Sequence, residues 1–219
     1  MCGRYNLIID AEALIDFFDI EHAAIEEFSP RYNISPSQDV PIVRNTGSGR
    51  VLVLARWGLV PHWSKEEKPT FSTINARADT VADKPTYRDP FKRKRCLVPS
   101  TGFYEWKRED DQKIPHHIRL PDGELFAFAG LWDHWDKEGA GFDSYSIIVT
   151  GANETMQPIH DRMPVILNPA QYNTWLNNKH FNRAQLESML VPYARTLKVN
   201  PVSRYVNNPK HDDAGCVAL

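Results

Sequence analysis

The sequence predicts an α+β fold with a mixed or barrel-like sheet flanked by short helices. Strand-like segments are short and numerous, and the helical segments between them are few and irregularly spaced. No βα repeat of regular period appears, which argues against a parallel doubly wound sheet. A chain of 219 residues with 42% hydrophobic residues is long enough to bury a sizeable core.

The expected strands are apolar segments bounded by turn-forming residues. They cover residues 3–9, 51–55, 95–98, 104–107, 116–120, 125–131 and 145–150. Residues 30–41 contain several prolines and are expected to be extended. The sequence Pro121-Asp122-Gly123 is typical of a tight turn, and it predicts a hairpin between the strands on either side of it.

Capping residues predict three helices. Asp10 is expected to cap a helix that runs to about Phe18. Asn168, followed by Pro169, predicts the start of a helix that runs to about residue 177. Asn182 predicts another over residues 183–190, with Gln185 at the capping-box position.

Composition limits the classes of function and the compartment. A net charge of −2 argues against a protein that binds nucleic acid over its whole surface, although it leaves room for a local basic groove. The three cysteines, Cys2, Cys96 and Cys216, lie far apart in the sequence. This spacing predicts neither a disulfide framework nor a zinc site, so we expect a reducing, cytoplasmic compartment and no metal or cofactor. No secretory signal or membrane-length apolar run is visible, so no membrane association is expected.

The second residue, Cys2, is the most unusual feature of the chain. If Met1 is removed, Cys2 carries an α-amine and a thiol on adjacent carbons, with ordinary pKa values of roughly 8 and 8.5. Such a 1,2-aminothiol attacks an aldehyde through nitrogen to give an imine, and then through sulfur to close a thiazolidine ring. The alternative is that the chain begins Met-Cys by chance and that Cys2 has no chemical role.

Three further residues are candidates for serving Cys2. Glu105 lies among aromatic residues, where burial would raise its pKa and make it a better base, although a solvent-facing edge-strand glutamate is the alternative. His160 lies beside an acid and a base in a proline-bounded loop, which suits a proton shuttle or an ordinary surface loop. Asn75, which precedes Arg77, is suited to orient a polar substrate, or else it caps a short helix that follows.

Eight motifs, taken together and in this order, resemble the SOS-response-associated peptidase (SRAP) family. They are Cys2-Gly3-Arg4, Arg31-Tyr32-Asn33-Ile34-Ser35-Pro36, Trp57-Gly58-Leu59-Val60-Pro61, Asn75-Ala76-Arg77, Cys96-Leu97-Val98-Pro99, Gly102-Phe103-Tyr104-Glu105-Trp106, His160-Asp161-Arg162-Met163-Pro164 and Pro201-Val202-Ser203. The resemblance extends from residue 2 to about residue 207, which is nearly the whole chain.

The resemblance implies a single SRAP domain over residues 1–219, with a peripheral tail after about residue 208. It implies an abasic-site processing protein that crosslinks covalently, as a monomer, to abasic sites in single-stranded DNA, including sites at junctions with double-stranded DNA. The implied catalytic residues are Cys2, Asn75, Glu105 and His160. The implied DNA-binding residues are Arg4, Arg77 and Arg162 near the backbone, with Trp106 and Thr150 lining the site.

Two other functions remain open from the residues. One is a cysteine peptidase that uses Cys2, His160 and Glu105, with removal of Met1 as its minimal activity. The other is a non-covalent reader of single-stranded or modified DNA that stacks bases on aromatic side chains. The basic run at residues 92–95 either extends a DNA footprint or forms a solvated turn.

Overall fold

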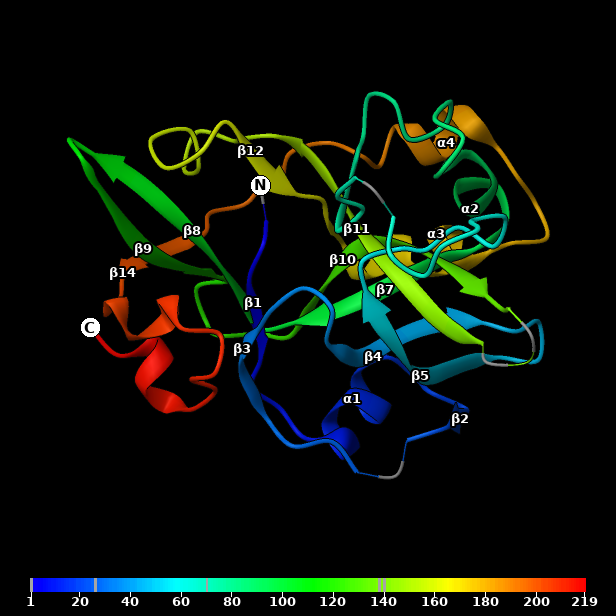
Figure 1. The fold of residues 1–219 in the computed structure, drawn as a ribbon, viewed down its shortest axis with the longest axis horizontal. Coiled ribbons are helices and arrows are strands. Elements are labelled where there is room, and N and C mark those ends of the chain that lie inside the picture. Colours follow the sequence, from blue (N-terminus) through cyan, green and yellow to red (C-terminus); the bar gives the residue numbers. More distant parts are fainter. Residues whose placement is uncertain (1, 26, 70, 138, 140) are drawn as a thin grey trace.

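The computed structural model describes residues 2–25, 27–69, 71–137, 139 and 141–219, and it arranges them in two sheets with short helices around them (Figure 1). The larger sheet closes on itself as a five-stranded barrel. Its strands, in order, are β11 (Phe142–Gly151), β10 (Phe126–Trp135), β7 (Arg95–Ser100), β4 (Asp39–Asn45) and β5 (Arg50–Trp57). The ring closes where β5 runs parallel to β11, with Trp57 opposite Tyr145, whereas its other pairs are antiparallel. The predicted α+β fold with a mixed, barrel-like sheet is therefore confirmed.

Short strands extend the barrel at its edges. β6 (Asn75–Arg77) pairs in parallel with β11, and β12 (Arg162–Pro164) pairs antiparallel with the end of β11. β13 (Ile166–Leu167) adds to β10, and β2 (His22–Ala23) adds to β5. The strands β6, β11 and β12 consequently bring three separate sequence motifs to one edge of the barrel.

The smaller sheet holds the N-terminal strand in its interior. Its order is β14 (Lys198–Pro201), β9 (Gln112–Arg119), β8 (Gly102–Glu109), β1 (Tyr5–Leu7) and β3 (Arg31–Ile34), with all pairs antiparallel. The β8–β9 hairpin projects from the left of the molecule in Figure 1, and the N-terminus lies between this sheet and the barrel. Because β1 has a neighbour on each side, the start of the chain is fixed in position.

Within the described part of the chain, four short α-helices lie around the sheets. They are α1 (Ala11–Phe17), α2 (Arg88–Arg93), α3 (Tyr172–Leu176) and α4 (Arg183–Glu187), together with single 3₁₀ turns at Pro169–Gln171, Arg204–Asn207 and Ala214–Val217. Two of the three predicted caps are present: the Asp10 side chain accepts from Ala13 N–H at 3.0 Å, and Asn182 accepts from Gln185 N–H at 3.1 Å. Among the described residues, no helix has both the length and the apolar character needed to cross a bilayer.

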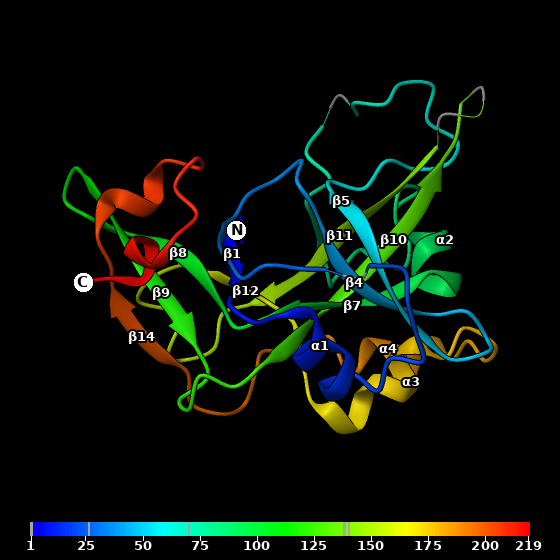
Figure 2. The ribbon, with the colours of Figure 1, turned by 90° about the horizontal axis from the view of Figure 1, so that it is seen from below.

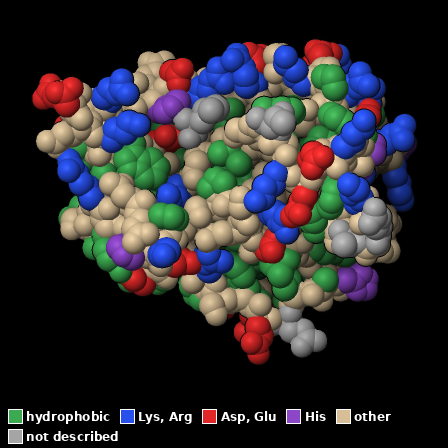
Figure 3. All heavy atoms as spheres, in the orientation of Figure 1, with side chains coloured by type: hydrophobic (Ala, Val, Ile, Leu, Met, Phe, Trp, Pro, Cys, Tyr) green, Lys and Arg blue, Asp and Glu red, His purple; other side chains and the backbone are tan. Residues whose placement is uncertain are grey.

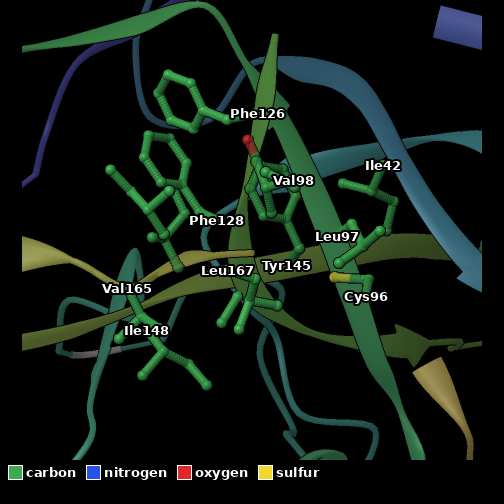
Figure 4. Close-up of a cluster of buried hydrophobic side chains, with 14 of the residues drawn as sticks. Ile42, Cys96, Leu97, Val98, Phe126, Phe128, Tyr145, Ile148, Val165 and Leu167 are labelled. Atoms are coloured by element: carbon green, nitrogen blue, oxygen red, sulfur yellow. The ribbon is translucent and has the colours of Figure 1, made fainter. Parts of the chain in front are cut away.

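The main core fills the barrel and reaches the N-terminal strand. Figure 4 shows Ile42, Leu97, Val98, Phe128 and Ile148 among the side chains that meet there. Tyr5 and Tyr145 are both fully buried, and their hydroxyl oxygens lie 2.8 Å apart. This hydrogen bond joins β1 of the smaller sheet to β11 of the barrel.

The segment after residue 208 packs against β3. The Asp212 carboxylate accepts from the backbone N–H groups of Tyr32 and Asn33, and it also pairs with Arg31. The Asn33 amide donates to three carbonyl oxygens of the same segment and of the turn before it. Figure 2 shows this segment beside the smaller sheet, near β8 and β9.

Three local predictions are wrong. The turn at residues 121–123 forms, with Gly123 at a φ of +72°, but it joins no hairpin because β9 and β10 belong to different sheets. Asn75 caps no helix, since it begins strand β6. The basic run at residues 92–95 is not a solvated turn, because it spans the end of α2 and the start of β7 and its last member, Arg95, is fully buried.

Arg95 connects the C-terminal ends of two helices. Its guanidinium donates to the carbonyl oxygens of Phe91 and Lys92 near the end of α2, both at 2.7 Å. It also donates to the carbonyl oxygens of Trp175 and Asn177 at the end of α3, at 2.6 and 2.5 Å. One cation therefore satisfies carbonyl groups that the ends of two helices leave without partners.

Replacing Arg95 should destabilise the fold strongly. Arg95→Met keeps an apolar stem but leaves several buried carbonyl groups without donors, so we expect the free energy of unfolding to fall by about 3 kcal/mol or more. Urea denaturation would measure this loss. The exposed neighbour Arg93 provides a control with the same charge change, and Arg93→Ala should cost less than about 0.5 kcal/mol. An equal loss of unfolding free energy in the two variants would contradict the role of Arg95 in satisfying the carbonyl groups at the helix ends.

Candidate active site

The start of the chain lies alongside the middle of β8. Tyr5 is opposite Phe103 in the antiparallel pair, and Tyr104 N–H donates to the carbonyl oxygen of Arg4 at 2.9 Å. Continuing this register sets Gly3 opposite Glu105 and Cys2 opposite Trp106, and Cys2 lies near enough to Glu105 for the carboxylate charge to act on its thiol. The residues Cys2 and Glu105, 103 positions apart in the sequence, therefore meet because of strand pairing.

Cys2 is held in place on its other side by Asn75. The Asn75 side-chain Nδ2 donates to the Cys2 carbonyl oxygen at 2.8 Å. Its Oδ1 is buried and has no hydrogen-bond partner among the described residues. The amide thus orients the backbone of Cys2 and retains one acceptor that a bound substrate could satisfy.

Burial sets the protonation of the two groups that meet at the N-terminal strand. Cys2 is fully buried, and this burial, followed by the negative charge of Glu105, raises the pKa of its thiol well above the ordinary value. Glu105 is only 4% exposed, and its burial raises the pKa of its carboxyl, while the charge of His160 opposes that rise. The thiol is therefore neutral near pH 7, and Glu105 is a stronger base than an exposed glutamate.

A cavity of about 420 Å³ opens beside Glu105. It is lined by Glu105, Trp106, Lys113, His160 and Asn207. The Trp106 indole N–H donates to the Asn207 side-chain oxygen at 2.8 Å, which fixes the plane of the ring. The cavity combines a buried carboxylate, an imidazole and an aromatic ring, a set suited to proton transfer next to a stacked base or sugar.

A second hollow, of about 310 Å³, brings together three of the expected DNA-binding residues. Arg77 from β6, Thr150 from β11 and Arg162 from β12 all line it, together with Asp79 and Asp161. Arg77 makes a two-point ion pair with Asp79 at 2.9 and 2.5 Å, and the Thr150 hydroxyl donates to the Leu190 carbonyl at 3.1 Å. The hollow therefore presents two guanidinium groups whose charge is balanced by two carboxylates.

His160 and Asp161 connect the cavity to the hollow. His160 lines the cavity, whereas Asp161, the next residue, lines the hollow. The His160 Nδ1 lies 2.8 Å from an Asp161 carboxylate oxygen and 3.0 Å from the backbone nitrogen of Arg162. In Figure 3, Lys and Arg side chains lie along the upper edge of the molecule near β12, with carboxylates between them.

Arg4, also expected at the DNA, lies in a different environment. Its guanidinium donates to the Asn33 side-chain oxygen at 2.7 Å and to the Val206 carbonyl at 3.0 Å. It also lies 5.9 Å from the centre of the Trp106 ring. In this structure Arg4 supports the wall of the cavity that carries Trp106, and its contact with DNA stays a prediction.

Sequence reasoning missed Lys113, Asn207 and Asp79 as members of the site. Lys113 enters the cavity because β9 begins at Gln112, four residues before the predicted strand, and pairs with the end of β8. Asn207 enters from a segment with no recognisable strand pattern. The described residues contain no group of three or more His, Cys, Asp or Glu side chains that could hold a metal ion.

Comparison with known proteins agrees with the resemblance in the motifs. The sequence profile of the SOS response associated peptidase (SRAP) family matches residues 1–209. The chain is 44% identical over 216 residues to the abasic site processing protein YoqW of Bacillus subtilis (strain 168), a match that covers 97% of this chain and 96% of that protein. It is 32% identical over 225 residues to the abasic site processing protein HMCES of Xenopus tropicalis, covering 88% of this chain and 67% of that protein.

A solved structure shows the same fold. The crystal structure of a protein from Bacteroides thetaiotaomicron superposes with a TM-score of 0.88 at 29% sequence identity, and the match covers 99% of this chain and 98% of that chain. The family profile spans nearly the whole chain, and the relatives match over most of their own length. The chain therefore belongs to the SOS response associated peptidase (SRAP) family.

Proposed function

We propose that this protein processes abasic sites in single-stranded DNA by forming a covalent thiazolidine crosslink through Cys2, once Met1 has been removed. The observation that carries the proposal is the position of Cys2, which is fully buried, near enough to Glu105 for its charge to raise the pKa of the thiol, and hydrogen-bonded through its carbonyl to Asn75. The names of its relatives as abasic site processing proteins support the choice of substrate.

The chemistry follows from the groups in the cavity. A ring-opened abasic sugar presents an aldehyde at C1′. Glu105 takes a proton from the Cys2 ammonium, and the neutral amine attacks the aldehyde carbon. The resulting hydroxyl leaves as water after His160 supplies a proton, which gives an imine. The thiol sulfur then bonds to the imine carbon while its proton passes to nitrogen, so the net reaction releases one water.

Closing the ring explains why the residue is a cysteine. A bare imine favours β-elimination and strand cleavage, because it acidifies the neighbouring carbon. Addition of sulfur consumes the imine and protects the strand. The unpartnered Oδ1 of Asn75 is available to accept a hydrogen bond from the adduct.

DNA would lie across the hollow and the cavity. Arg77 and Arg162 are suited to hold phosphates, with Thr150 beside them, and Trp106 is suited to stack on a base. We extend the proposal to abasic sites at single-strand/double-strand junctions, to residues 1–219 acting as one monomeric domain, and to an intracellular location.

Removal of Met1 by the protein itself is the second activity that we propose. It would be a single hydrolysis of the Met1–Cys2 peptide bond at the same site. A general cysteine peptidase is less well supported, because a peptidase uses a thiolate and the pKa of the Cys2 thiol is raised. A non-covalent DNA reader would leave the Cys2–Glu105–Asn75 arrangement without a role.

Blocking the α-amine should abolish crosslinking. A variant with one residue inserted between Met1 and Cys2 keeps the thiol but has no aminothiol, so it should bind single-stranded DNA within about twofold of wild type and form no stable adduct. A denaturing gel with an abasic oligonucleotide measures the adduct, and intact mass shows whether Met1 is present. Full crosslinking by the extended chain would rule out the thiazolidine.

Removing sulfur alone should stop the reaction at the imine. Cys2→Ala retains the α-amine after Met1 removal, so we expect little heat-stable adduct unless borohydride is added, together with more strand cleavage. Adduct yield with and without borohydride provides the measurement. Cys96→Ala removes another buried thiol and should crosslink normally. If Cys2→Ala formed as much heat-stable adduct as wild type, sulfur would have no role.

Glu105 and His160 should respond differently to pH. Below the ordinary amine pKa of roughly 8, Glu105→Gln should slow adduct formation about tenfold or more, and the rate should recover toward about pH 9 because solvent then deprotonates the amine. The wild-type rate should rise with pH from a point above the ordinary glutamate range, because burial raises the Glu105 pKa. His160→Ala lacks a proton donor, so high pH should not rescue it. Rescue of His160→Ala alone would show that the two roles are reversed.

A further inference from the structure

A basic cavity of about 520 Å³ lies against β9 and β14 and shares no lining residue with the cavity beside Glu105. Figure 2 shows these two strands side by side, with the C-terminal segment next to them. Its basic lining residues are His117, Arg119 and Lys198, and its apolar ones are Ile8, Val217 and Leu219. The volume of the basic cavity is that of a small-molecule site.

Two cations line the basic cavity as direct neighbours. Arg119 of β9 and Lys198 of β14 are opposite each other in the antiparallel pair, so their side chains lie on the same face of the sheet. Like charges in this position repel each other and destabilise a sheet. Among the described residues, neither cation forms an ion pair with a carboxylate. An anion in the basic cavity would offset this repulsion.

The Arg119 guanidinium is held in place by the turn that follows β9. Its Nη1 donates to the carbonyl oxygens of Leu120 and Pro121, at 3.2 and 3.0 Å. The turn is tight, with Gly123 at a φ of +72°, and Gly123 also lines the basic cavity. The charge of Arg119 is therefore positioned before any ligand arrives, which lowers the entropy lost on binding.

A chain of buried hydrogen bonds fixes the proton of His117. The Thr101 hydroxyl accepts from the Ile8 N–H at 2.9 Å, so its own proton goes to the Asn6 Oδ1, also at 2.9 Å. This contact sets the orientation of the Asn6 amide, whose Nδ2 then donates to His117 Nε2 at 2.8 Å. Nε2 therefore holds a lone pair, and the neutral ring carries its proton on Nδ1.

The Nδ1–H group is the part of this ring that can serve a ligand. His117 is only 8% exposed, and a Cβ added at Gly102 would lie 2.2 Å from Nε2, so the Nε2 edge is packed against protein. Nδ1 has no hydrogen-bond partner among the described residues, and the accessible edge of the ring faces the basic cavity that His117 lines. Burial, followed by the charge of Arg119, lowers the pKa of His117 to about 4, so Nδ1–H belongs to a neutral ring near pH 7.

We propose that the basic cavity binds a small organic acid, whose carboxylate lies among His117 Nδ1–H, Arg119 and Lys198. The apolar part of the acid packs on the apolar lining, Ile8 and Val217 among it. A carboxylate has two oxygens that accept from several donors at once, and its charge complements both cations. This site is separate from the Cys2 site and does not depend on the proposed reaction with DNA.

Titration of the full chain with sodium hexanoate tests the site. At constant ionic strength near pH 7, hexanoate should shift the His117 side-chain nitrogen-15 signals and the β14 amide signals in a saturable way, with a Kd of about 5 mM or tighter. Hexanol lacks the charge and acetate lacks the apolar chain, so each should bind at least about fivefold more weakly. The free protein should show a protonated Nδ1 and a lone pair on Nε2.

Charge variants show whether the proposed residues hold the acid. Lys198→Gln and Arg119→Gln each remove one cation and lie outside the hydrogen bonds that fix His117, so they should fold normally and weaken hexanoate binding at least about fivefold. Lys107 lies in the same sheet but pairs with Glu109 and does not line the basic cavity. Lys107→Gln should therefore bind hexanoate within about twofold of wild type.

Several results would overturn the proposal. They are shifts that grow linearly without saturation, binding of hexanol or acetate as tight as that of hexanoate, and full affinity in both cavity variants. Equal weakening in Lys107→Gln would show a general effect of charge rather than a site. A free His117 with its proton on Nε2 would remove the donor on which the site depends.

Discussion

The site depends on the pairing of β1 with β8 and β3, because this pairing fixes a chain terminus that would ordinarily fray. The hydrogen bond from Tyr104 N–H to the Arg4 carbonyl and the one from Asn75 to the Cys2 carbonyl hold the first residues from two sides. The buried contact between the hydroxyls of Tyr5 and Tyr145 then fastens β1 to the barrel. An N-terminal amine can act as a positioned nucleophile only if the backbone that carries it is ordered in this way.

In the proposed reaction, burial around this terminus favours attack through nitrogen before sulfur. Burial raises the pKa of the Cys2 thiol, and the negative charge of Glu105 raises it further. The thiol therefore stays protonated near neutral pH. The same carboxylate is a base whose own pKa is raised by burial, which suits it to accept a proton from an ammonium group. In the proposed reaction, one carboxylate therefore keeps the thiol protonated while it activates the amine, and the sulfur reacts once an imine has formed.

The sequence predicted most helices and strands and several residues that line the cavity. It did not predict which of these elements and residues contact one another. Caps at Asp10 and Asn182 are local signals, and both were confirmed. The turn before β10 was assigned to a hairpin because a tight turn does not reveal which sheet each flanking strand joins. Lys113 was missed because β9 begins four residues before the predicted strand and pairs with the end of β8, and Asn207 was missed because it lies in a 3₁₀ turn outside both sheets.

Charge in the hollow explains how a protein of net charge −2 can be suited to DNA. Arg77 and Arg162 are accompanied by Asp79 and Asp161, so the hollow has little net charge and little attraction for polyanions in general. In the proposed DNA complex, a phosphate replaces Asp79 at the Arg77 guanidinium, which makes binding depend on a DNA backbone that also fits the cavity. In the proposed function, non-specific affinity for undamaged strands is thereby reduced, and the covalent step supplies the permanence that the ionic contacts do not.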